Sequence, residues 1–211
     1  MLYPIELRAH VNRSLAPRLI GYAERLKKPE EVEVKIAAIS AASLRKKLRA
    51  AGFRVRRPRL LEQNLALDDP RGNLRGNGLL LRVRRAGAEV IVTYKGPVAR
   101  GVHKRREEQE FLASDFDACM AVFAGVGLRP TFLYEKYRAE YERAGEPGHV
   151  TVDETPIGVF MELEGPARWI DTTAKVLGFG RADYITASYT TLYLVWCREH
   201  EITPGNMVFG S

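Results

Sequence analysis

Apolar and charged residues alternate in many short segments of this chain. The clearest segment is "EEVEVKI", residues 30–36. Successive side chains of a β-strand point to opposite faces, so Glu31, Glu33 and Lys35 would share one face and the intervening apolar residues the other. A single strand of this kind ordinarily turns its charged face to water, because antiparallel sheets are often solvated on one side.

The same alternation recurs along the chain and predicts eight strands, at 30–37, 60–67, 78–86, 88–95, 104–112, 131–143, 148–154 and 157–164. Helical patterns interrupt them. "SAASLRKKLRAAG" has Ser40 as a plausible N-cap and Gly52 as a stop, and "SDFDACMAVFAGVG" reads as a second capped helix. Two further helices are expected at 167–178 and 184–198, with Ser188 and Tyr189 packing the last one on the sheet. Mostly adjacent strands with interspersed helices indicate an antiparallel α+β domain.

The charged positions of these strands are in phase, and this changes the interpretation of the first strand. An open sheet would expose one broad, densely charged face while the helices cover only the other. Eight strands can instead close with the apolar faces outward, which leaves an interior that admits one small ligand. We therefore predict an eight-stranded, mostly antiparallel closed β-barrel with helices packed outside. Charges inside it need water, opposite charges, metal ions or a charged ligand, because desolvation costs several kcal/mol per ion.

The charges expected inside the barrel are of both signs. Arg and Lys bind phosphates, and carboxylates hold hard divalent cations, so this mixture is typical of a metal–phosphate site. The residues expected to bind phosphate are Lys35, Arg82, Arg84, Lys95, Arg106, Lys136 and Arg138. The residues expected to bind metal are Glu31, Glu33, Glu108, Glu110, Asp153, Glu162 and Glu164.

In order along the chain, these motifs resemble the triphosphate tunnel metalloenzymes, or CYTH domains, the family of class IV adenylyl cyclase and thiamine triphosphatase. The hallmark Glu-x-Glu-x-Lys is followed by "LRVR", "TYK", Arg-x-Glu-x-Glu, Lys-x-Arg, "VDETPIGVFMELEG" and "SYTTLYL". The resemblance covers about residues 30–197. The second strand departs from it, with Glu62, Asn64 and Ala66 where many members carry an Asp–Tyr-type pattern.

The resemblance implies a tunnel that binds a small-molecule triphosphate with Mg2+ or Mn2+, and Lys35, Arg106 and Lys136 as catalytic residues. We favour hydrolysis, in which water attacks a metal-polarised phosphate of inorganic triphosphate, a nucleoside triphosphate such as ATP, or thiamine triphosphate. One alternative is a class IV adenylyl cyclase, which converts ATP to cyclic AMP and pyrophosphate. Another is a non-catalytic module that binds polyphosphate or RNA 5′-triphosphates.

Composition adds limits to this interpretation. The net charge of +7 in 211 residues indicates a polyanionic partner. The sequence has no pattern of a sequence-specific nucleic-acid module, no membrane span and no signal peptide. Cys119 and Cys197 match no metal or redox spacing, so we expect a cytoplasmic protein with reduced thiols, as a monomer or homodimer. The expected organisation is an N-terminal arm at 1–29, the tunnel domain at 30–200 and a tail at 201–211.

Overall fold

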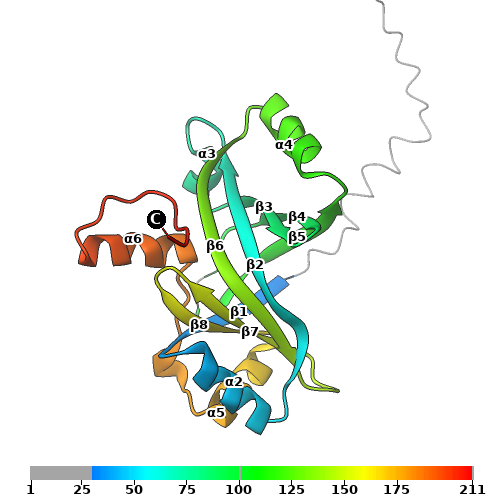
Figure 1. Cartoon of the computed structure of the whole chain (residues 1–211), viewed down its shortest axis with the longest axis vertical. Helices are drawn as coiled ribbons and strands as arrows, with labels where there is room; N and C mark the ends of the chain where they lie inside the picture. Colours follow the sequence, from blue (N-terminus) through cyan, green and yellow to red (C-terminus); the bar gives the residue numbers. More distant parts are fainter. Residues whose placement is uncertain (1–29, 100, 211) are drawn as a thin grey trace, which may run out of the picture.

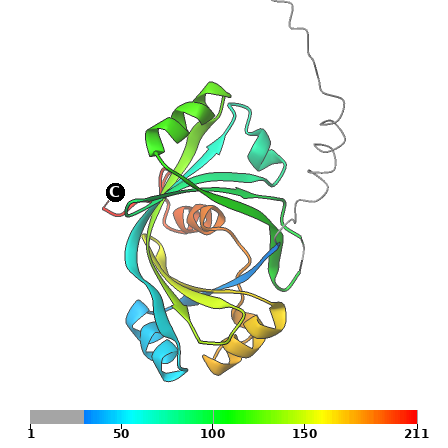
Figure 2. The ribbon, with the colours of Figure 1, turned by 90° about the vertical axis from the view of Figure 1, so that its right-hand side faces the viewer.

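A computed structural model describes residues 30–99 and 101–210, so the expected arm at 1–29 lies outside the described residues. Eight antiparallel strands form a closed barrel in the order β1-β5-β4-β3-β2-β6-β7-β8, with β8 pairing again to β1 (Figures 1 and 2). The predicted architecture is confirmed. The strands are β1 Glu30–Ala38, β2 Arg54–Asp68, β3 Leu80–Ala86, β4 Glu89–Lys95, β5 Lys104–Ala113, β6 Arg129–Glu142, β7 His149–Thr155 and β8 Gly158–Glu164.

The helices lie outside the barrel, as predicted (Figure 1). The Ser40 Oγ caps the first described helix by accepting the Ser43 N–H at 3.2 Å. No helix in the described part of the chain is long and apolar enough to cross a membrane. The helical elements are α2 Ala41–Ala50, the short α3 Asn73–Gly76, α4 Phe116–Gly125, α5 Ala167–Val176, the 3-10 turn η1 Arg181–Asp183 and α6 Tyr189–Glu199.

Three apolar clusters lie between the barrel and these helices. The largest joins residues such as Val34 and Met161 of the barrel to Leu44 of α2 and Ile170 of α5. The second lies under α4, and the third joins α6 to β6, β8 and Met207. Burial of the apolar strand faces against helices is the main stabilising contribution. The charged faces of the same strands consequently point into the barrel.

Two element boundaries differ from the prediction by more than two residues. The second strand begins at Arg54 rather than at residue 60, because pairing with β6 extends it through "RVRRPR", a segment without alternation. The last helix begins at Tyr189 rather than at 184, because Ile185 is extended and its backbone pairs with that of Lys35. In Figure 2, which looks into the ring of strands, α6 lies across the far end of the barrel.

The C-terminal residues 201–210 also belong to this end of the barrel. The Met207 N–H donates to the Leu133 carbonyl at 3.0 Å, and the Met207 carbonyl accepts the Glu135 N–H at 2.8 Å. The segment therefore pairs with the first half of β6, on the side of that strand away from β2. It packs beside α6 in the third apolar cluster.

Candidate active site

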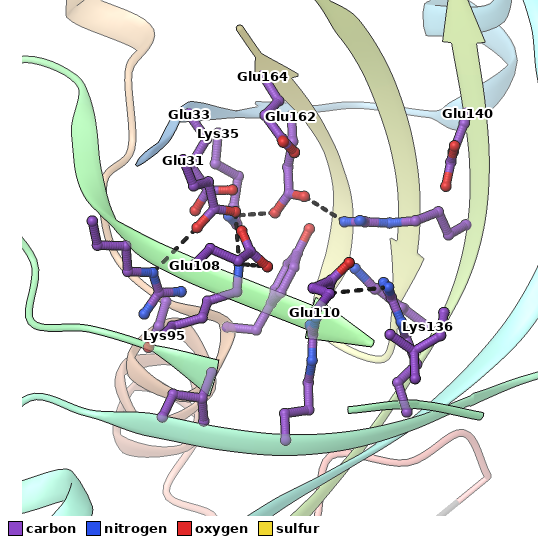
Figure 3. Close-up of a pocket in the computed structure, with 18 of the residues that line it drawn as sticks. Glu31, Glu33, Lys35, Lys95, Glu108, Glu110, Lys136, Glu140, Glu162 and Glu164 are labelled. Carbon is purple, nitrogen blue, oxygen red and sulfur yellow. Dashed lines mark hydrogen bonds and ion pairs between the residues drawn. The ribbon is translucent and has the colours of Figure 1, made fainter. Parts of the chain in front are cut away.

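The barrel encloses a cavity of about 640 Å3 to which all eight strands and the start of α6 contribute (Figure 3). Of the fourteen residues expected to bind phosphate or metal, thirteen line this cavity, and Asp153 does not. The charged faces thus point inward, where strand alternation placed them. Figure 3 shows Glu31, Glu33 and Glu164 on one side of the cavity and Lys136 on the other.

The basic side of the cavity, here called the basic pole, consists of Arg82, Arg84, Lys136 and Arg138. Arg82 donates to the Thr93 hydroxyl at 3.0 Å and lies 3.3 Å from a Glu110 oxygen. Burial and the positive charge of Arg82 together lower the pKa of Arg84 from its usual range. The lowered pKa means that the surroundings of Arg84 do not fully compensate its buried charge, and a bound anion would do so.

Asp153 lies behind the basic pole and is fully buried. Its carboxylate accepts hydrogen bonds from Lys136 at 3.0 Å, from Arg138 at 2.6 and 2.7 Å, and from the Tyr189 hydroxyl at 2.6 Å. Because these donors occupy both of its oxygens, the structure places Asp153 as the residue that holds Lys136 and Arg138 toward the cavity. We predicted that Asp153 binds a metal ion, whereas in the structure hydrogen-bond donors surround its carboxylate.

Glu162 connects the two sides of the cavity. One of its oxygens accepts from Lys35 Nζ at 2.6 Å, and the other contacts Arg138. Burial opposes the charged form of each partner, but mutual attraction outweighs it, so the pKa of Glu162 is lowered and the pKa of Lys35 is raised. Glu110 is likewise occupied by the Thr93 hydroxyl and the arginines. Both carboxylates therefore balance the cationic side chains.

The acidic side, here called the acidic pole, consists of Glu31, Glu33, Glu108 and Glu164. Lys95 at 2.6 Å and Arg106 at 3.2 Å overcome the burial of Glu31 and hold its pKa at about 2. Burial and the Glu31 charge raise the pKa of Glu108 to about 7, although Lys95 also lies 3.0 Å away. Burial and the same carboxylates raise the pKa of Glu164 to about 8. Negative charge is in excess here.

The acidic pole fits a hard divalent cation by its donor chemistry. Within the described residues, no three His, Cys, Asp or Glu side chains converge as a ready-made metal site. The raised pKa values of Glu108 and Glu164 nevertheless mean that these carboxyl groups hold their protons more tightly than usual, because they are buried and lie near other carboxylates. A cation with a preference for oxygen ligands could replace those protons.

Four further side chains of the site were not predicted as ligands. Lys104 ion-pairs with Glu33, Glu62 lies 3.4 Å from Arg84, and the Tyr134 hydroxyl is 3.4 Å from Arg82. Lys104 and Tyr134 share a strand face with the predicted residues Arg106 and Lys136, and Glu62 shares one with Asn64, so alternation alone could have identified all three. The fourth is Tyr189 of α6, whose ring lies 4.4 Å from Lys35 Nζ. Packing of the last helix on the barrel was predicted, but its contact with the cations was not.

The family model of the CYTH domain matches residues 29–177, and the chain belongs to this family. A relative from Methanocaldococcus jannaschii, named "Putative adenylate cyclase", is 26% identical over 148 residues, which are 70% of this chain and 83% of the relative. The structure of a "putative adenylate cyclase" from Vibrio parahaemolyticus is similar, with 19% identity, a TM-score of 0.68, and coverage of 77% of this chain and 96% of that one. A structure from Hippeastrum, described as a "putative adenylyl cyclase" with a dominant triphosphatase activity, has the same fold. Its sequence is 17% identical and its TM-score is 0.58, and the match covers 82% of this chain and 98% of that one.

Proposed function

We propose that this protein is a divalent-metal-dependent enzyme that hydrolyses a phosphoanhydride bond of a triphosphate bound inside the barrel. The observation that carries the proposal is that one cavity is lined both by Arg84, whose positive charge its surroundings disfavour, and by Glu164, whose negative charge its surroundings disfavour. A triphosphate alone would be attracted by the basic pole and repelled by the acidic pole. A metal–triphosphate complex matches both.

The proposed roles follow the two poles. Glu31, Glu33, Glu108 and Glu164 would hold Mg2+ or Mn2+, which when bound polarises a phosphate oxygen. The basic pole binds the phosphate oxygens through charge-assisted hydrogen bonds, together with Lys35, Lys95 and Arg106. We assign Asp153, Glu162 and Glu110 to holding these cations in place rather than to the metal.

Lys35, Arg106 and Lys136 are the proposed catalytic residues. Lys136 is 2% exposed and is held between Asp153 and Glu62, so its ammonium group has a fixed position at the cavity wall. A fixed cation stabilises negative charge that develops on a phosphate oxygen as the anhydride bond breaks, without first having to reorganise. The attacking water takes the phosphoryl group, and the remaining diphosphate leaves as the anion that these cations neutralise.

The alternative is cyclisation of ATP to cyclic AMP and pyrophosphate. It is favoured by the name of the Methanocaldococcus relative, which matches most of its own length. The cavity volume is within the range of sites that bind nucleotide-sized ligands. A binding module without turnover is the second alternative, because the same poles would hold a triphosphate without cleaving it.

One assay separates these functions. The purified protein is incubated with inorganic triphosphate, ATP or thiamine triphosphate in the presence of Mg2+ or Mn2+, and orthophosphate, pyrophosphate and cyclic AMP are measured. Orthophosphate release that is lost in Lys136→Met and kept in the exposed-surface control Lys175→Met is the expected result. Cyclic AMP with pyrophosphate would support the cyclase, and tight binding without product would support the binding module.

A further inference from the structure

The inward face of β2 carries a fully buried amide behind the basic pole. Asn64 is 0% exposed, and neither its Oδ1 nor its Nδ2 has a hydrogen-bond partner among the described residues. A buried polar group without a partner is destabilising, so it needs an explanation. Six buried side-chain atoms in the described part of the chain have no such partner, and five of them belong to Glu62, Asn64, Arg82 and Arg84.

Strand pairing places Asn64 directly opposite Arg84. The ladders join Asn64 to Arg84 of β3 on one side and to Tyr134 of β6 on the other. Directly opposite residues of antiparallel strands have Cβ atoms about 4.5–5.5 Å apart. Glu62 lies two positions before Asn64 and shares its face, and its Oε1 accepts from Arg84 at 3.4 Å. Arg84 lines the cavity and Asn64 does not, so the amide lies beside this arginine on the side away from the cavity.

Arg84 shares both of its carboxylate partners with other cations. It lies 3.4 Å from Glu62 and 3.5 Å from Glu110, and Glu110 is also 3.3 Å from Arg82. Burial would raise the pKa of Glu62, but Lys136 and three arginines outweigh it and hold the pKa at about 2. The negative charge of Glu62 is thus divided among four cations. Burial and Arg82 accordingly lower the pKa of Arg84.

Arg138 shows what a dedicated carboxylate does in the same geometry. The ladder between β6 and β7 places Asp153 directly opposite Arg138, and both oxygens of this fully buried carboxylate accept from the guanidinium, at 2.6 and 2.7 Å. Asn64 occupies the equivalent position opposite Arg84. Asparagine has nearly the shape of aspartate but no charge. The two arginines therefore differ in whether the residue paired with them across the ladder is charged.

We propose that Asn64 is a specificity-determining residue, which leaves Arg84 without a carboxylate of its own so that the bound anion supplies the balancing charge. The inference rests on the proposed function. A carboxylate at position 64 would bind Arg84 as Asp153 binds Arg138, and would neutralise it from the side away from the cavity. Because Coulomb energy scales with the charge of the ligand, the uncharged amide favours the more highly charged of two anions.

The test is Asn64→Asp, which adds a negative charge with almost no change in shape. We expect the Kd for tripolyphosphate, measured by calorimetric titration with Mg2+ at fixed ionic strength, to rise at least about tenfold, or roughly 1.4 kcal/mol. The Kd for pyrophosphate, which carries less charge, should rise less, so the preference for tripolyphosphate should fall. The urea midpoint of Asn64→Asp should be at or above that of the wild-type protein, because the new carboxylate pairs with Arg84.

Two further variants separate the effect of charge at this position from other effects. Asn64→Val removes the amide without adding a charge, and it should keep the wild-type affinities for both anions. Asn73→Asp makes the same change of charge at an exposed position of α3 away from the cavity lining, and it should also keep both affinities. A loss of affinity that is confined to Asn64→Asp would therefore support the inference.

Three outcomes would overturn the inference. The first is a wild-type affinity for tripolyphosphate in Asn64→Asp, and the second is an equal loss in Asn64→Val, which would show that the amide acts through hydrogen bonds rather than through its lack of charge. The third is a lower urea midpoint in Asn64→Asp, which would show that no pair with Arg84 forms. If the wild-type protein neither binds nor cleaves tripolyphosphate, the proposed function fails as well. If it does both while Asn64→Asp keeps the wild-type affinity, only the inference about Asn64 fails.

Discussion

Arg84 and Arg138 both line the tunnel, but their charges are balanced differently. Arg138 is clamped by Asp153 and Glu162, and these carboxylates overcome burial and raise its pKa well above the usual value. Burial and Arg82 lower the pKa of Arg84, whose carboxylate partners are 3.4 and 3.5 Å away. We infer that Arg138 contributes mainly to the stability of the site and Arg84 mainly to ligand binding.

This contrast gives a paired prediction. Arg138→Gln should lower the free energy of unfolding by about 3–5 kcal/mol, because it leaves buried carboxylates without their cation. Arg84→Gln should leave that free energy unchanged or higher, and should weaken triphosphate binding by about 2–5 kcal/mol. Urea denaturation and calorimetric titration measure the two quantities. The assignment is wrong if Arg84→Gln destabilises the fold as much as Arg138→Gln does.

The raised pKa of Glu164 predicts how the metal-free protein responds to pH. The pKa is about 8 in the folded state and about 4.5 in the unfolded state, so the folded protein binds more protons between these values. The contribution of Glu164 to stability is therefore complete below pH 4.5 and is lost as the pH rises through about 8. Glu164→Gln should flatten the dependence of unfolding free energy on pH in this window, measured with a chelator present.

The raised pKa of Glu164 also predicts how metal binding depends on pH. A carboxyl group must lose its proton before it binds a cation, so Mg2+ affinity should increase with pH up to about 8. Glu199→Gln, at an exposed position on α6 away from the cavity lining, is the matched control and should retain both the stability profile and the metal profile of the wild-type protein. An unchanged stability profile in Glu164→Gln would show that this carboxyl group is not the one that titrates.

The alternation of apolar and charged residues predicted which residues line the tunnel, but it did not predict their hydrogen-bond and ion-pair partners. It fixes which face a side chain is on, and thirteen of the fourteen predicted residues line the cavity for this reason. It does not fix which strands become neighbours. Asp153 is on the inward face, yet Lys136 and Arg138 of β6 and Tyr189 of α6 occupy its oxygens. In the sequence, a carboxylate that accepts hydrogen bonds from basic side chains cannot be distinguished from one that is free to bind a metal ion.

At the scale of elements, the misplaced boundaries are those that long-range pairing determines. "RVRRPR" has no alternation and contains a proline, so its local pattern does not predict a strand, and β6 imposes one on it. Similarly, helical periodicity extends back to residue 184, but Ile185 pairs with Lys35 and the helix begins after Ser188. The cap and apolar stripe of α2 are local features, and this helix was accordingly predicted well.

Substitution of Tyr189 tests whether α6 helps to position the cationic side chains at its end of the barrel. Tyr189→Phe removes the hydroxyl that donates to Asp153 at 2.6 Å and keeps the ring that lies over Lys35. Because the acceptor is charged, we expect a loss of about 1.5–3 kcal/mol in unfolding free energy. We also expect a lower kcat, because Asp153 holds Lys136 and Arg138.

Tyr193→Phe is the comparison for this variant. It lies on the same helix, and its hydroxyl donates to a neutral acceptor, the Asn206 carbonyl, at 3.1 Å. We expect it to cost about 1 kcal/mol and to leave kcat unchanged. Equal effects of the two substitutions on stability and kcat would indicate that α6 only covers the barrel and does not position its cations.

At the scale of the whole molecule, closure of the barrel follows from the quantity of charge on one strand face. Helices cover the outside of the sheet, so the charged faces must either form an open polar surface or surround an interior. The density and mixed sign of the charges favoured the interior, and the closed strand order confirms it. The particular reaction does not follow from this reasoning, because one arrangement of charges can bind a triphosphate for hydrolysis, cyclisation or retention.

The two poles also predict that metal and triphosphate stabilise the protein cooperatively. Without metal, the carboxylates of the acidic pole repel a polyanion, and without triphosphate a cation lacks its phosphate ligands. Tripolyphosphate with Mg2+ should therefore raise the unfolding temperature by more than the sum of the two separate shifts. At a hundredfold excess over Kd, a ligand stabilises the folded state by about 2.7 kcal/mol, which is measurable by calorimetry. Glu164→Gln should reduce this excess, because it removes a carboxylate that the cation can bind after displacing its proton. Equal stabilisation by tripolyphosphate with Mg2+ and with a chelator would contradict a shared metal–phosphate site and would leave a tunnel that binds the anion through its arginines and lysines alone.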